Sequence, residues 1–139
     1  MNKTYAIGLI ALGLNSNYEM LMVENDGLYS LPEMSIEALD KDNIVDGAIS
    51  LAERLGLSIE QKSLAYVVRQ QVPDSDEIII SYYFIAAVTG EDKVPNGYKW
   101  LTDVSGKFDK SIYPTKFIES IEQHLKNGWL MGDIEIINE

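Results

Sequence analysis

The stretch 31–57 constrains the fold most, because it predicts a loop, an amphipathic helix and a glycine stop in one continuous run. Asn43 is the expected N-cap of this helix, and Gly56 is placed to end it. Apolar residues recur at helical spacing, so one face of the helix should be buried in a core. These apolar positions are Ile44, Ala48, Leu51, Ala52 and Leu55.

The opposite face of the same helix is polar. Asp46, Ser50 and Glu53 project within roughly 60° of one another at 3.6 residues per turn. Any chemistry on this helix should therefore involve that face.

Residues 49–57 resemble the second half of the Nudix box, G-x5-E-x7-R-E-U-x-E-E-x-G-U, a signature of hydrolases that act on nucleoside diphosphates linked to another moiety. Both aliphatic positions, one glutamate (Glu53) and the glycine (Gly56) are kept. The box arginine and two of its glutamates are replaced by Ile49, Ser50 and Arg54. The box is degenerate: its scaffold positions are retained better than its chemical ones.

The first half of the box is altered as well. Leu31-Pro32-Glu33-Met34 stands where the family usually has Leu-Pro-Gly-Gly. With about one inserted residue, the lone box glutamate falls on Asp40 or Lys41. Because Glu33 replaces a glycine that allows a tight backbone turn, the path of this loop should differ from that of the family.

The resemblance implies a cofactor, Mg²⁺ or Mn²⁺, held by carboxylates on the helix face against a pyrophosphate. Glu53 is the implied catalytic and metal-binding residue, with Asp46 and Asp40 as candidate relocated metal ligands. Ser50 is a weak neutral ligand and Arg54 carries a fixed positive charge. Asp46 lies roughly 10 Å of helix rise from Glu53, too far to share one ion directly.

Three further residues are candidates for binding substrate. Arg54 could contact an anionic ligand directly, or satisfy carbonyl groups at the helix C-terminus. Glu33 belongs to an acidic loop at 33–42, which is either a solvated loop or a metal-binding segment. Trp100 either packs in the core or stacks on a nucleobase. The expected partner is a small nucleotide-like or other phosphorylated ligand.

Composition excludes several other classes of function. The 139 residues suit a single Nudix-like domain at 1–139. The net charge of −11 and the absence of any Lys or Arg run argue against nucleic-acid polymers and anionic membranes as partners. No cysteine, signal peptide or long apolar span is present, so a cytoplasmic location is expected.

The order of predicted elements indicates an α/β (α+β) fold, a Nudix-like α/β/α sandwich with a mixed central sheet. A box helix at about 44–55 and a C-terminal helix at about 114–126 should flank the sheet, with 77–89 as a central strand. Extended segments are expected at 4–14, 18–24, 28–31, 64–71, 77–89 and 98–101.

The C-terminal part of the chain contains two further features. The only histidine, His124, lies near the end of the second helix, where it could favour the helix dipole or act as a ligand or base. The tail 129–137 is too apolar for a free end, so it should pack back on the domain or across a homodimer interface.

Two functions from different classes follow. The first is a metal-dependent hydrolase that uses Glu53 with relocated ligands among Asp46, Asp40 and Glu33. The second is a ligand-binding or regulatory module on a Nudix scaffold without hydrolysis. The replaced box carboxylates favour a hydrolase whose catalysis is weakened or lost.

Overall fold

The computed structural model describes residues 2–16, 19–37, 41–72, 74–126 and 134–138. Strands dominate this part of the chain, and no helix in it is long and apolar enough to cross a membrane. The elements are β1 (Asn2–Gly13), β2 (Met20–Asn25), β3 (Leu28–Ser30), β4 (Glu33–Ile36), α1 (Lys41–Arg54), β5 (Ser58–Gln71), β6 (Glu77–Thr89), the 3-10 turn η1 (Glu91–Lys93), β7 (Tyr98–Leu101), α2 (Thr115–Lys126) and β8 (Ile134–Asn138).

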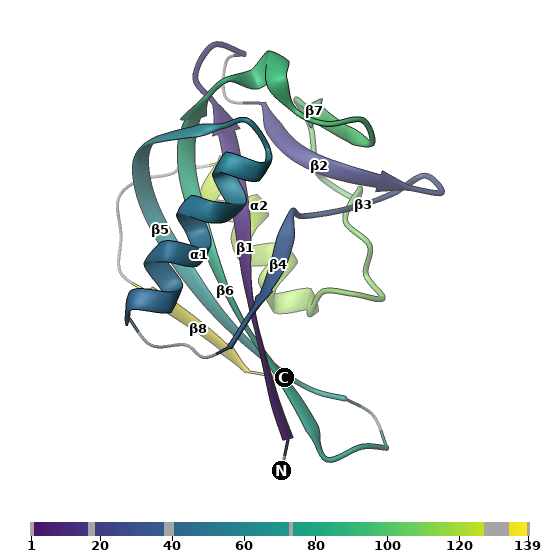
Figure 1. The fold of residues 1–139 in the computed structure, drawn as a ribbon. Coiled ribbons are helices and arrows are strands. Elements are labelled where there is room, and N and C mark those ends of the chain that lie inside the picture. The colour runs from purple at the N-terminus through teal and green to yellow at the C-terminus, as the bar shows by residue number, and fades with distance from the viewer. Residues whose placement is uncertain (1, 17–18, 38–40, 73, 127–133, 139) are drawn as a thin grey trace.

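The strands form one mixed sheet between the two helices (Figure 1). Its main order is β3-β2-β1-β6-β5-β8, with β4 also pairing β1 and β7 pairing β2. The long central strand β6 runs parallel to β1 and antiparallel to β5. The predicted mixed α/β/α arrangement and the central place of 77–89 are confirmed.

Each face of the sheet has its own hydrophobic core, because the side chains of β1 alternate between them. Ile7, Leu9 and Ala11 face α1, whereas Ile10 and Leu12 face α2, and all five are fully buried. The two cores explain why β1 lacks polar positions in its second half. The predicted burial of this strand on both faces is confirmed.

One edge of β1 is shared by two partner strands. Near its C-terminal end Leu12 pairs with Met20 of β2, and near its middle residues 5–8 pair with β4. Between them, the backbone N–H of Leu9 donates to the Pro32 carbonyl oxygen at 3.0 Å. Figure 1 shows β2 and β4 leaving β1 in different directions, so the sheet forks at this point.

The box helix has the predicted apolar face. Ala48, Leu51, Ala52 and Leu55 are buried in the α1-side core, and Ile44 packs against it. Its end is also as predicted: Gly56 has a positive φ of 73°, and Leu57 N–H donates to the Ala52 carbonyl oxygen at 2.9 Å. With Gly56 N–H bonding the Glu53 carbonyl oxygen, this is a Schellman motif.

The start of that helix was predicted wrongly. The helix begins at Lys41, so Asn43 lies inside its first turn and is not the N-cap.

Two strands extend into segments that were predicted to be irregular. Residues 33–36 of the supposed loop form β4, because Met34 and Ile36 alternate with polar residues and pack on the α1-side core. Strand β5 starts at Ser58, not at 64, by pairing with the end of β6. Register shifts at 59–61 and 62–64 let this polar stretch remain in the sheet.

The C-terminal tail packs back on the domain. Residues 134–138 form β8, which runs parallel to β5 at one edge of the sheet. This confirms the first of the two expectations for the tail, while its earlier part lies outside the described residues.

Candidate functional site

The polar face of α1 carries the carboxylates that the box resemblance singles out. Asp46 and Glu53 are exposed, and Ser50 between them is half-buried. Arg54 is exposed in the last helical turn. Asp40, the third predicted ligand, lies outside the described residues.

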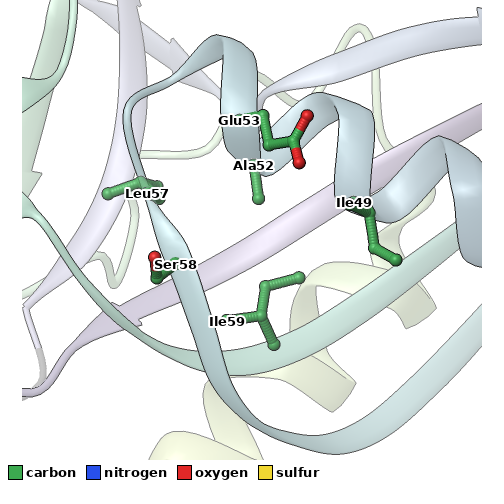
Figure 2. A pocket seen from close by; sticks show the side chains of 6 residues that line it. All are labelled: Ile49, Ala52, Glu53, Leu57, Ser58 and Ile59. Carbon is green, nitrogen blue, oxygen red and sulfur yellow. The ribbon is translucent and has the colours of Figure 1, made fainter.

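Glu53 lines a pocket of about 250 Å³ between the second half of α1 and the start of β5. Figure 2 shows Ile49, Ala52 and Glu53 on the helix side of this space, facing Leu57, Ser58 and Ile59 on the chain that leads into the strand. Four of the six described lining residues are aliphatic, although polar groups form about half of the pocket surface, and Ile49 is 47% exposed. Among these described residues, Glu53 alone is charged.

The described residues of this site do not by themselves supply the ligand set for the divalent ion that the resemblance implies. A Mg²⁺ or Mn²⁺ ion beside a pyrophosphate needs several oxygen ligands at one point. Among the described residues, no group of three or more His, Asp or Glu side chains converges. Ser50 and Arg54 occupy the turn where further carboxylates would be required.

Glu33 lies on the other side of the sheet from Glu53. Its Oε1 accepts a hydrogen bond from the Tyr83 hydroxyl at 2.9 Å, and its Oε2 accepts one from the Tyr113 hydroxyl at 3.2 Å. Both tyrosines are 4% exposed and belong to the α2-side core. The structure therefore separates Glu33 from the α1 carboxylates.

Gly8 makes the bond between Tyr83 and Glu33 geometrically possible. In register, Gly8 of β1 pairs with Tyr83 on one side and with Glu33 on the other. A Cβ atom at Gly8 would lie 2.2 Å from the Tyr83 ring. Because Gly8 has no side chain, the ring can lie over β1 and reach the carboxylate two strands away.

The second tyrosine also fixes the loop before β4. The Tyr113 hydroxyl accepts a hydrogen bond from the buried backbone N–H of Leu31 at 2.7 Å. One hydroxyl group thus binds the backbone on one side of Pro32 and the side chain on the other. This arrangement holds the altered Leu-Pro-Glu-Met segment at the fork of the sheet.

The electrostatics of this cluster favour its uncharged forms. Although Glu33 as a whole residue is exposed, the protein packed around its carboxyl group desolvates it and raises its pKa, while the hydrogen bonds from Tyr83 and Tyr113 lower that pKa in part. Burial and the nearby Glu33 charge raise the pKa values of both tyrosine hydroxyls. Both tyrosines therefore remain hydrogen-bond donors through the physiological pH range.

Trp100 lies half-buried on β7 against the α1-side core. Its indole N–H donates to the Glu91 carbonyl oxygen at 2.9 Å. Packing thus accounts for its position, and stacking on a base stays a prediction. The side chain of His124 lies outside the described part of the chain.

Sequence reasoning missed Gly8, Tyr83 and Tyr113. A glycine within an aliphatic strand is a signal of close approach by another group. That signal marks the position but does not identify the partner, since Tyr83 lies 75 residues further along the chain.

Comparison by sequence finds neither a matching family model nor a matching curated protein. Solved structures do match. The C-terminal domain of mouse MUTYH, solved in complex with human PCNA, is 12% identical, with a TM-score of 0.61 and 93% of each chain covered.

Two hydrolases have comparable similarity to this chain. An Ap4A hydrolase from C. elegans is 13% identical, with a TM-score of 0.60 over 89% of this chain and 98% of that one. A MutT Nudix hydrolase from Burkholderia pseudomallei is 15% identical, with a TM-score of 0.56 over 86% and 98%. Together with the mixed sheet between two helices, these similarities show that the chain has a Nudix-like fold.

Proposed function

We propose that this protein is a ligand-binding module on a Nudix-like scaffold and that its box helix does not support pyrophosphate hydrolysis. The observation that carries the proposal is the composition of the α1 site. Among the described residues that line the pocket Glu53 is the single charged one, and Ser50 and Arg54 occupy the positions of box glutamates. A divalent ion that acts as a Lewis acid supplies on the order of several kcal/mol of transition-state stabilisation. A site that lacks the charged ligands for such an ion loses this contribution.

The proposed ligand is small, nucleotide-like or otherwise phosphorylated. The pocket can accept an uncharged part of such a ligand, because its surface combines aliphatic side chains with a similar share of polar groups. Arg54 is exposed in the last turn of the same helix and does not itself line the pocket, and a guanidinium can bond a phosphoryl group without a metal. The C-terminal domain of mouse MUTYH has a similar fold and is described in complex with another protein.

The rival function is a hydrolase with relocated metal ligands. It is supported by the similarity to an Ap4A hydrolase and a MutT hydrolase, and by Asp46 and Glu53 sharing an exposed helix face. It requires ligands from separate turns, or from Asp40, to act together.

A product-detecting assay separates the two functions. The purified protein is tested against a panel of nucleoside-diphosphate derivatives with Mg²⁺ or Mn²⁺, beside Glu53→Gln and a Ser50→Glu, Arg54→Glu double variant. We expect no divalent-dependent turnover by the wild type. Turnover that disappears in excess chelator and in Glu53→Gln would establish the hydrolase and overturn the proposal.

Binding is measured on the same panel by calorimetry. We expect Arg54→Met to weaken binding of a phosphorylated ligand by about tenfold or more, and Arg54→Lys to weaken it less. Equal affinities for wild type and Arg54→Met would show that Arg54 does not bind the ligand. Lys3→Met, which removes an exposed cation from β1, is the matched control.

A further inference from the structure

A second cavity of about 320 Å³ lies on the α2 side of the sheet, between the segment 105–110 and α2. Its floor is apolar: Phe108 is 2% exposed and Ile118 is 7% exposed, and both belong to the α2-side core. The cavity is separated from the Glu53 pocket by the sheet. An inference drawn from it therefore stands independently of the function proposed for α1.

The walls of this cavity carry both signs of charge. Lys110 lines it together with Glu119 and Glu122 of α2. Among the described residues, the one ion pair joins Lys99 to Glu24, so Lys110 does not pair with either glutamate. Charges of opposite sign thus line one cavity without neutralising each other.

The neighbouring acidic groups are partly committed to the backbone. Glu122 Oε1 accepts a weak hydrogen bond from Gly106 N–H at 3.4 Å. Asp109, next to Lys110, accepts bonds from the Ser111 backbone N–H and hydroxyl at 2.9 and 2.6 Å. Glu119 is exposed and lines the cavity, which leaves it as the carboxylate best able to meet a ligand.

We propose that this cavity binds a small zwitterion, a free α-amino acid with an apolar side chain. The carboxylate of the ligand pairs with Lys110, its ammonium group pairs with Glu119, and its side chain lies on Phe108 and Ile118. A plain anion would face two carboxylates in a chain of net charge −11. A plain cation would pair with the glutamates but would also face Lys110, whereas a ligand with both charges complements both walls.

The full-length protein can be titrated with leucine and phenylalanine, followed by calorimetry and by amide chemical shifts. Each amino acid is compared with its amide, which lacks the carboxylate, and with its N-acetyl form, which lacks the ammonium group. We expect saturable binding of the free amino acids and at least about tenfold weaker binding of both derivatives. The shifts should concentrate at residues 105–122.

Two variants test the walls separately. Lys110→Met should weaken binding of the free amino acid by about tenfold without weakening binding of its amide, a cation that Lys110 repels. Glu119→Gln should weaken binding of the free amino acid to a similar degree without weakening binding of the N-acetyl derivative, an anion that Glu119 repels. Lys3→Met and Glu37→Gln remove exposed charges elsewhere and should change neither affinity.

The proposal is overturned if the amide or the N-acetyl form binds as tightly as the free amino acid. It is equally overturned if no apolar amino acid binds at up to about 10 mM, since a charge-paired site should be filled at that concentration. Binding whose shifts concentrate on α1 would assign the ligand to the Glu53 pocket instead.

Discussion

Glu33 and Glu53 are both carboxylates of the box region, yet the structure gives them different environments. Glu33 is held by two buried tyrosine hydroxyls at the fork of the sheet, on the α2 side. Glu53, which like Glu33 is exposed to solvent, lies on the α1 side at the edge of a pocket whose described lining residues are mostly aliphatic. The difference shows that a carboxylate of a degenerate motif can form hydrogen bonds that stabilise the fold without taking part in catalysis or ligand binding.

The two environments have a common physical cause. Both side chains are exposed to solvent, so the difference lies in the hydrogen-bond donors beside each carboxylate. Tyr83 and Tyr113 provide such donors for Glu33, whereas the residues around Glu53 in its pocket are mainly aliphatic. We therefore expect substitutions around Glu33 to change stability, and substitutions at Glu53 to change binding.

The largest effect is expected from Gly8→Ala. The new Cβ would meet the Tyr83 ring at 2.2 Å, so the ring must move and lose its bond to Glu33. Overpacking and the lost hydrogen bond together should lower the free energy of unfolding by about 3 kcal/mol, measured by urea denaturation. In a Tyr83→Ala background the same change should cost much less. Additive effects of the two substitutions would show that the ring does not depend on Gly8.

The next largest effect is expected from Tyr113→Phe. This change removes the acceptor of the buried Leu31 N–H as well as a donor to Glu33. Leaving a buried N–H without a partner should lower the free energy of unfolding by about 1–3 kcal/mol.

Two further tyrosine substitutions allow the loss of unfolding free energy in Tyr113→Phe to be compared with smaller losses. Tyr83→Phe removes a bond to Glu33 but no backbone partner, so it should cost about 1 kcal/mol. Tyr29→Phe removes a bond between exposed groups, from the Tyr29 hydroxyl to Glu24, and should have the smallest effect of the three. A Tyr113→Phe protein as stable as Tyr29→Phe would contradict a structural role for this cluster.

Local patterns in the sequence predicted most of the elements. The spacing of apolar residues around Leu51 and the glycine at 56 fixed the face and the end of α1, because both are properties of a few neighbouring residues. The β-branched and aromatic content of 77–89 predicted β6 and its central place. The four residues of β4 were missed because so short a strand depends on its pairing with β1.

The candidate site was much harder to predict. The contact of Glu33 with Tyr83 spans 50 residues, and its contact with Tyr113 spans 80. Such contacts follow from strand register across the sheet, which no local pattern specifies. The box resemblance correctly suggested the scaffold, but it grouped Glu33 with Glu53 because the two are close in sequence.

A smaller effect should appear in the pH dependence of stability. The pKa of Glu33 is raised above its ordinary value in the folded state, mainly by burial. The folded state therefore binds this proton more tightly than the unfolded state does. The stability that this adds is fully present below pH 4.5, the ordinary value, and is lost as the pH rises through the raised pKa.

Glu33→Gln removes this titration while keeping a hydrogen-bonding side chain. The melting temperature of wild type relative to Glu33→Gln should fall as the pH rises above 4.5. Parallel curves for the two proteins between pH 4.5 and neutrality would show that the carboxyl does not couple to folding. The same comparison with Glu53→Gln supplies the baseline for removing an exposed carboxylate.

The smallest effect on stability is expected from Glu53→Gln itself. Surface substitutions away from buried networks usually change the free energy of unfolding by about 0.5 kcal/mol or less. Glu53 is exposed, and its pocket opens to solvent past the exposed side chain of Ile49. If urea denaturation of Glu53→Gln instead showed a loss comparable to that of Tyr113→Phe, Glu53 would have buried partners of its own. The contrast between a carboxylate that supports the fold and one that is free for a ligand would then fail at the residue on which the proposed function depends.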